Sequence, residues 1–502
     1  MILLRNGAIF DGTGKPAIRG GVLIAGDRIA QVGAFPAPAE ARVIDCTGLA
    51  ISPGFIDAHS HSDLQVLESR PEKALQGVTT EVVGNCGFSP YPAPPDLGPL
   101  HEFANGIFRG DDQWGWRSAA DYLADVKRAA RLVNVASLVG HGSLRIAEAG
   151  HRLGALAPVE VAAMERMLDE ALEQGASGFS TGLMYSPGES APPEELERLC
   201  RVAARRGAIY TSHIRSYAAA LVEAVEEQIG LARRTGCRLQ ISHLQAVGPA
   251  NWPKQAEAIE RIERAREEGI EIGFDCYPYV AGSTVLTQFL PQWALAGGIG
   301  GLLARLRDRS ARARIAAQTV AGLAQRWSDL YIAAVGSAEN RDLVGKNLEE
   351  IAESRGREPV EAAFDLLLEE RGEVTVLEFN QSEENLRAVL THPLANVVSD
   401  GFYVKGRPHP RLHGTFPYLL GEICRERGWM PLAEGIRKIT DLPARRFGIA
   451  QRGRIERGWF ADITVFDPRK IASAATYDNP EVAPTGIRHV FRNGEAVLAA
   501  TV

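Results

Sequence analysis

Eight apolar, strand-like runs separated by helical runs constrain the fold of this 502-residue chain more than any other feature. The helical runs carry apolar residues at spacings of three and four, and the runs 159–173, 219–234 and 254–268 are each closed by a glycine. Eight such units favour an α/β fold with a (β/α)8 TIM barrel over an open doubly wound sheet, for which we find no glycine-rich dinucleotide turn. The predicted strands are the run that starts at Phe55 and leads to His59, and residues 80–84, 135–140, 178–182, 208–213, 239–243, 272–276 and 396–400.

Short alternating segments occupy both ends of the chain. They are residues 2–4, 8–10, 21–24 and 28–32 at the start, and 461–466 and 487–491 at the end, where Arg492-Asn493-Gly494 supplies a turn. Because so few short strands cannot form a stable sheet at each end, we expect them to pair into one small β-sandwich domain. This assigns residues 1–53 and 449–502 to the β domain and 54–448 to the barrel.

The interval from about 285 to 371 is longer than one barrel crossover needs. It contains Trp293, Trp327 and a strand-like run at 330–335. An insertion after a barrel strand lies over the catalytic face, so we expect a lid or a substrate contact here. The alternative is an insertion that packs on the outside or makes an oligomer contact.

The charge balance favours a small-molecule ligand. The formal charge of -7 is spread along a chain with 23% charged and 45% hydrophobic residues, and no basic block suggests nucleic acid or a membrane surface as a partner. The start of the chain has too short an apolar run for a secretory signal, and the six scattered cysteines do not form a disulfide pattern. We therefore expect a cytoplasmic protein, without a prediction of its oligomeric state.

Polar side chains with metal-binding chemistry end five of the predicted strands. On a closed barrel these ends meet at one mouth, and His59 and His61 project from the same side because strand residues two apart share a face. Imidazole, thiolate and carboxylate together suit zinc. The predicted metal ligands are His59, His61, Cys86, His213, His243 and Asp400.

Each of these residues also has a plain structural interpretation. A single buried histidine is more often hydrogen-bonded than metal-bound, a free cysteine is often a core residue, and Asp400 could cap a turn. A nucleophilic role for Cys86 is less favoured, because metal-activated water would be the attacking group. In that chemistry Asp400 is placed to act as general base and then general acid.

With these residues placed, the chain resembles the amidohydrolase superfamily, and within it the D-aminoacylase (N-acyl-D-amino acid deacylase) branch. The motifs that carry the resemblance are SPGFIDAHSHSD (52–63), GNCG (84–87), GHGSLR (140–145), STGLMY (180–185), YPYVAGST (277–284), SDG (399–401), HPRLHGTFP (409–417), RGRI (452–455) and GWFAD (458–462). The resemblance implies a zinc ion held tightly by Cys86, His213 and His243, and a second, weaker site on His59, His61 and Asp400. It also implies hydrolysis of N-acyl-D-amino acids to a carboxylate and a free D-amino acid.

The same resemblance suggests the substrate contacts. Tyr185 and Tyr279 match positions that look like such contacts, and Ser283, Arg145 and Arg215 are further candidates; structural tyrosines and salt-bridged arginines are the alternative. Where relatives often have a lysine that holds the substrate carboxylate, this chain has Gln245, which carries no charge. A related hydrolase of a cyclic, hydantoin-like amide or of a D-dipeptide is therefore an alternative, as is a barrel that only binds ligands.

Overall fold

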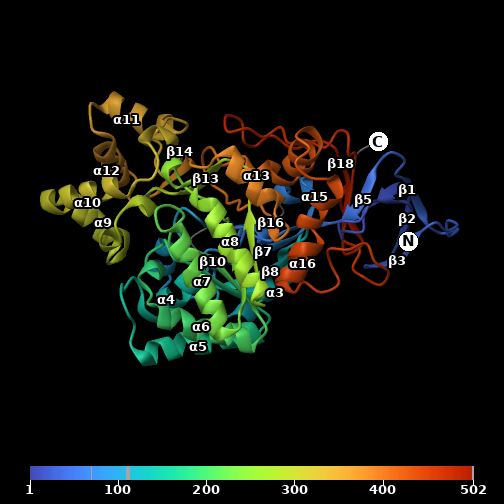
Figure 1. The fold of residues 1–502 in the computed structure, drawn as a ribbon, viewed down its shortest axis with the longest axis horizontal. Coiled ribbons are helices and arrows are strands. Elements are labelled where there is room, and N and C mark those ends of the chain that lie inside the picture. Colours follow the sequence, from blue (N-terminus) through green and yellow to red (C-terminus); the bar gives the residue numbers. More distant parts are fainter. Residues whose placement is uncertain (69, 109–113, 500–502) are drawn as a thin grey trace.

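An eight-stranded parallel barrel forms the centre of the computed structural model, which describes residues 1–68, 70–108 and 114–499 (Figure 1). Each strand pairs with the next strand along the barrel in parallel register, so the predicted (β/α)8 fold is confirmed. All eight predicted runs form barrel strands. They are β6 (Phe55–Asp57), β7 (Val78–Val83), β8 (Asn134–Gly140), β9 (Gly178–Gly182), β10 (Ile209–His213), β11 (Arg238–Ile241), β12 (Ile272–Cys276) and β16 (Ala395–Val397).

The segments that follow β6 and β16 close the barrel. Ser60 and Gly401 form a parallel bridge, and the Asp400 amide donates to the His59 carbonyl at 2.8 Å. The His61 amide donates to the Gly401 carbonyl at 3.0 Å. Closure of the sheet therefore brings the predicted metal ligands from the first and last strands side by side.

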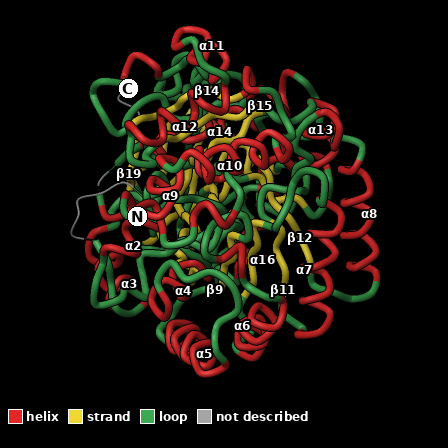
Figure 2. Tube along the Cα trace, turned by 90° about the vertical axis from the view of Figure 1, so that its left-hand side faces the viewer, coloured by secondary structure: helices red, strands yellow, loops and turns green. Residues whose placement is uncertain are grey.

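Helices surround the barrel strands (Figure 2). Three of them, α5, α7 and α8, lie within two residues of the predicted bounds, and Gly175, Gly236 and Gly269 follow them with positive φ, as expected for C-terminal stops. No helix in the described part of the chain is long and apolar enough to cross a membrane. The α-helices of the described residues outside the long insertion are α1 (Glu72–Leu75), α2 (Gly98–Phe103), α3 (Ala119–Ala129), α4 (His141–Ala149), α5 (Pro158–Glu173), α6 (Pro193–Arg205), α7 (Leu221–Thr235), α8 (Lys254–Glu267), α13 (Glu383–Thr391), α14 (Arg411–Tyr418), α15 (Leu432–Lys438) and α16 (Asp441–Phe447), and a π-helix, Leu419–Glu426, follows α14.

Both ends of the chain contribute strands to one hydrogen-bonded sheet at the side of the barrel where the two termini lie (Figure 1). Strands β5 and β17 join the two halves in antiparallel register, and the sheet has an apolar core of its own that includes Ile24, Ile463 and Phe491. The strands are β1 (Ile2–Ile9), β2 (Ile18–Ala25), β3 (Arg28–Gly33), β4 (Arg42–Asp45), β5 (Ala50–Pro53), β17 (Ile463–Phe466), β18 (Ile487–Arg492) and β19 (Glu495–Ala499). The boundaries at 53/54 and 448/449 stay a prediction.

The first strand differs from the sequence-based expectation. The segments 2–4 and 8–10 were expected to be separate strands, but β1 runs from Ile2 to Ile9 without a break. Its pairing with β2 shifts register between Leu4 and Gly7, where Asn6 has a φ of 63°. Asn6 and Gly7 form a β-bulge within the strand instead of a turn between two strands.

The long insertion extends from the opposite end of the barrel (Figure 1). The predicted strand at 330–335 is β14, which belongs to an antiparallel sheet in the order β13-β15-β14. Its other strands, β13 and β15, lie outside the predicted interval, and the insertion has a separate apolar core that includes Leu302, Ile332 and Phe364. Its elements are β13 (Ala281–Val285), α9 (Gly298–Arg307), α10 (Arg309–Gly322), β14 (Leu330–Val335), α11 (Leu348–Arg355), α12 (Pro359–Glu369) and β15 (Val374–Phe379).

Candidate metal centre and active site

Six strand-end side chains converge at the carboxyl end of the barrel, and we call them the donor cluster. All six are buried. They form three overlapping triads whose nitrogen, sulfur or oxygen atoms all lie within 4.8 Å of one another. The triads are His59, His61 and Cys86; Cys86, His213 and His243; and His59, His243 and Asp400.

Cys86 lies at the centre of the donor cluster. Its Sγ is 3.2 Å from His59 Nε2 and 3.6 Å from His243 Nε2. On the other side, His213 Nδ1 is 3.1 Å from His243 Nε2. The Cys86 sulfur and the imidazole groups, from strands far apart in the sequence, therefore face a single point.

Asp400 lies between two histidines and an arginine. Its Oδ1 is 3.3 Å from His59 Nε2 and 3.2 Å from His61 Nε2, and its Oδ2 is 3.0 Å from Arg411 Nη1. Burial raises the pKa of Asp400, but Arg411 and His59 outweigh burial and hold this pKa well below its ordinary value. Asp400 is therefore a carboxylate at neutral pH.

The backbone at the donor cluster is held in uncommon conformations. The φ angles of Cys86, His243 and Asp400 are 53°, 33° and 50°. A side chain at Gly84 or Gly87 would place its Cβ within 2.7 Å of neighbouring backbone atoms, so both glycines that flank Cys86 permit close packing. Residues other than glycine keep positive φ only where the surrounding structure enforces it, and such residues gather at functional sites.

The donor cluster fits a zinc ion. Burial holds the pKa of His213 well below its ordinary value and lowers that of His243 to about 4, so both are neutral imidazoles, the form that binds metal. Asp275 lies behind the cluster: its Oδ1 is 3.3 Å from His59 Nδ1 and accepts the His243 amide at 2.7 Å. A carboxylate behind a ligand histidine is a common way to orient it, and mixed nitrogen, sulfur and oxygen donors suit zinc better than magnesium or calcium.

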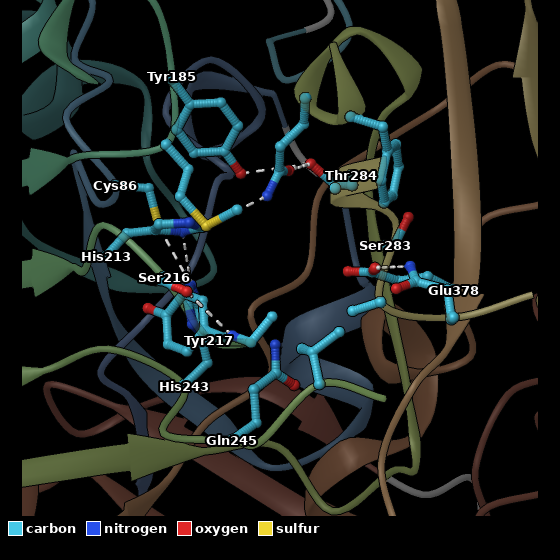
Figure 3. A pocket seen from close by; sticks show the side chains of 18 of the residues that line it. Cys86, Tyr185, His213, Ser216, Tyr217, His243, Gln245, Ser283, Thr284 and Glu378 are labelled. Carbon is cyan, nitrogen blue, oxygen red and sulfur yellow. Dashed lines mark hydrogen bonds between the residues drawn. The ribbon is translucent and has the colours of Figure 1, made fainter. Parts of the chain in front are cut away.

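A cavity of about 260 Å³ opens on the donor cluster. His61, Cys86, His213, His243 and Asp400 line one side, which we call the barrel wall. Figure 3 shows Ser283 and Glu378 across the cavity from Cys86, His213 and His243. This opposite side, the insertion wall, consists of Ser283, Thr284, Gln288, Phe289, Leu290, Pro291, Gln318, Gly322, Leu323, Ala324, Gln325 and Glu378.

Two of the five predicted substrate contacts lie on this cavity, together with Gln245. Tyr185 packs against the His213 ring, and its hydroxyl is 3.3 Å from Thr284 Oγ1. The Ser283 hydroxyl donates to the Val376 carbonyl at 3.0 Å. Gln245 accepts the Tyr277 hydroxyl on Oε1 at 2.9 Å, and Figure 3 shows its amide pointing into the cavity.

The other three predicted contacts are not among the described residues that line the cavity. Tyr279 stacks on Tyr418, with ring centroids 5.0 Å apart. The Arg145 guanidinium is buried against Glu195. Arg215 pairs with Glu227 and donates to the carbonyls of Glu189 and Ala191.

Sequence reasoning missed three charged residues around the site. Asp275 interrupts an apolar strand run, and this interruption was a usable signal. Arg411 follows His409-Pro410 in a motif that was recognised without a role for the arginine. Glu378 lies on β15, in a part of the chain where no barrel periodicity pointed to it.

Comparisons with known proteins agree with this geometry. Residues 42–498 match the amidohydrolase family. The chain is 38% identical over 500 residues to the N-acyl-D-glutamate deacylase of Alcaligenes xylosoxydans xylosoxydans, covering 99% of this chain and 93% of the relative. It is 34% identical over 505 residues to the D-aminoacylase of the same organism, covering 99% and 94%.

A solved structure extends the similarity to three dimensions. The N-acyl-D-glutamate deacylase of Bordetella bronchiseptica, in complex with zinc and a phosphonate inhibitor that mimics the tetrahedral intermediate, superposes with a TM-score of 0.85 at 36% identity. The match covers 99% of this chain and 96% of the solved chain. Fold, strand-end chemistry and sequence agree throughout, and this chain belongs to the amidohydrolase family.

Proposed function

We propose that this protein is a zinc-dependent hydrolase that cleaves the amide bond of N-acyl-D-amino acids into a carboxylate and a free D-amino acid. The observation that carries the proposal is the meeting of Cys86, His213 and His243 beside an ionised Asp400 at the base of a cavity. Two relatives support it: those that share 38% and 34% of their residues with this chain over 99% of its length are named N-acyl-D-glutamate deacylase and D-aminoacylase.

Two groups of residues would hold metal. Cys86, His213 and His243 would bind the tight zinc ion. His59 and His61, which both contact Asp400 Oδ1, would form a second, weaker site with that carboxylate. When bound, zinc supplies a Lewis acid that polarises the amide carbonyl and acidifies water.

Asp400 would move the proton. Its carboxylate accepts a proton from the attacking water and returns it to the leaving nitrogen, so that the products are the carboxylate and the amine. Arg411 contacts Oδ2 and lowers the pKa of Asp400, which keeps the carboxylate ionised before the attack and makes its protonated form a stronger acid toward the leaving nitrogen.

Polar groups on the cavity would orient the substrate. Tyr185 would donate to the acyl carbonyl, and Ser283 would contact the substrate from the insertion wall; both residues line the cavity (Figure 3). Tyr279, Arg145 and Arg215 are not among the described residues that line this cavity, and their side chains contact Tyr418, Glu195 and Glu227 instead.

A chiral substrate panel tests the proposal. Zinc-loaded protein is expected to hydrolyse N-acetyl-D-amino acids with kcat/KM well above the values for the L forms, and stripping zinc is expected to remove the activity until zinc is restored. Activity confined to the L forms would refute the stereochemical part. Inactivity on every amide class would favour a barrel that only binds ligands.

Gln245 supports a second candidate. A neutral residue at this point of the cavity suits an amide substrate whose carboxylate is absent or masked, as in a hydantoin-like ring or a D-dipeptide. Faster turnover of hydantoins or D-dipeptides than of N-acetyl-D-amino acids would favour it.

The cytoplasmic location stays a prediction. Its support is that all six cysteines are buried and unpaired, as is usual where thiols are kept reduced.

A further inference from the structure

Glu378 is a buried carboxyl group on the insertion wall, separate from the donor cluster. It lies on β15 opposite Gly282 of β13, and the residue is 9% exposed. A Cβ at Gly282 would lie 3.0 Å from Glu378 Oε1, so the glycine leaves room for the carboxyl group. Figure 3 shows Glu378 facing the cavity beside Ser283, across from the metal-binding side chains.

Glu378 is held in place by a neutral partner. Gln325, from the segment after α10, donates its Nε2 to Glu378 Oε2 at 3.0 Å. Within residues 1–68, 70–108 and 114–499, no lysine or arginine forms an ion pair with this carboxyl group. Burial raises its pKa to about 7, against the opposing effects of Asn380, Gln325 and Arg411.

The charge of Arg411 lowers the pKa of Glu378, but the described contacts of the Arg411 side chain are with other groups. Its side chain is 1% exposed, its Nη1 faces Asp400, and its Nη2 donates to the Ser283 carbonyl at 3.4 Å. Its guanidinium also lies over the Tyr277 ring, 4.5 Å from the centroid. Glu378 therefore keeps an acceptor for a cation that enters the cavity.

A buried carboxyl group without a cationic partner costs stability, so such groups are kept mainly where a ligand pairs with them. We propose that Glu378 recognises a positively charged side chain of the substrate, so that the preferred substrates are N-acyl derivatives of D-lysine or D-arginine. The inference rests on the proposed deacylase function. The proposed side-chain preference differs from that of the relatives named for D-glutamate. In this cavity the side-chain carboxylate of a D-glutamate substrate would meet the carboxyl group of Glu378.

Side-chain selectivity tests this assignment. The panel contains N-acetyl-D-lysine, its neutral isostere N-acetyl-D-norleucine, and N-acetyl-D-glutamate, each measured as kcat/KM with zinc-loaded protein. We expect D-lysine to exceed D-glutamate by about 30-fold or more, the size of effect seen when a buried charge gains or loses its partner. Glu378→Gln is expected to reduce the D-lysine to D-norleucine ratio about tenfold or more, and Glu378→Lys to shift preference toward D-glutamate.

A matched control removes the same charge elsewhere. Glu384→Gln, at an exposed position of α13, should leave both the ratio and the rates unchanged. The melting temperature of each variant shows that the loss of preference is not a loss of fold.

The outcomes separate the two proposals. If neutral N-acetyl-D-amino acids are hydrolysed but D-glutamate matches D-lysine, or Glu378→Gln leaves the ratio unchanged, the side-chain assignment is overturned and the deacylase function stands. If no N-acyl-D-amino acid is hydrolysed, both are overturned.

Discussion

The two walls of the cavity are built in different ways. The barrel wall presents one side chain from the end of each of five parallel strands, whose positions are fixed by the hydrogen-bonded ring. The insertion wall belongs to an antiparallel sheet domain with a separate apolar core. Its lining residues come from β13 and β15, from residues 288–291 after β13, and from the end of α10 with the loop that follows it. Under the proposed function, bond cleavage would take place on the rigid ring and substrate choice on the appended sheet, which can vary without disturbing the barrel.

Removal of the proton acceptor from the barrel wall should have the largest effect. Asp400→Asn keeps the size of the side chain but cannot accept a proton at neutral pH, so we expect kcat to fall by about 10²- to 10⁴-fold. The tight zinc ion should remain, since its proposed ligands are untouched. Steady-state kinetics and a zinc count on the same sample measure both effects.

Asp342→Asn provides the control, because this aspartate has a side chain 73% exposed in the insertion and should change neither quantity. An Asp400→Asn enzyme with full activity would remove Asp400 from the mechanism. Loss of all zinc in this variant would mean that Asp400 is a ligand of the tightly bound zinc ion.

Loss of the Cys86 sulfur should remove the tightly bound zinc ion from the barrel wall. Cys86→Ala removes the one sulfur donor of the cluster, so we expect the zinc content to fall from about one per chain toward zero, with activity lost in proportion. Cys46→Ala, a buried cysteine in the β domain, is the matched control and should keep its zinc. Full zinc and full rate in Cys86→Ala would mean that the ligand set is wrong.

The same difference between the walls explains how far sequence reasoning reached. Residues such as His213 and His243 end parallel strands, and a closed barrel leaves those ends only one place to meet, so strand periodicity was enough to bring them together. Glu378 pairs with Gly282 of β13, 96 positions earlier in the chain, and no periodic signal fixes such a pairing. Arg215 is an error in the other direction. Its residue type suggested a substrate contact, but its guanidinium forms an ion pair with Glu227.

The pH dependence of selectivity probes the insertion wall alone. With a pKa of about 7, Glu378 is mostly protonated at pH 6 and mostly ionised at pH 8. Arg411 is the charged group that acts on it, and Gln325 and Asn380 are neutral neighbours. We expect the kcat/KM ratio of N-acetyl-D-lysine to N-acetyl-D-norleucine to rise about tenfold over this range, following the ionised fraction.

The ratio cancels ionisations on the barrel wall, because both substrates share the same reaction. Glu378→Gln should give a flat ratio from pH 6 to pH 8. A rise that persists in this variant would assign the titration to another group.

The smallest expected effect concerns the substrate α-carboxylate at the edge between the two walls. Gln245 offers its Nε2 amide there while Tyr277 occupies Oε1, so the carboxylate would receive a neutral hydrogen bond. Gln245→Lys replaces this donor with a charged one and should lower KM for N-acetyl-D-norleucine about three- to tenfold, the margin of a charge-assisted over a neutral hydrogen bond. Gln245→Met, which removes the donor without adding charge, should raise the same KM. If KM is unchanged in both variants, the carboxylate binds elsewhere and the cyclic-amide candidate gains support, since a ring without a free carboxylate would be indifferent to this position.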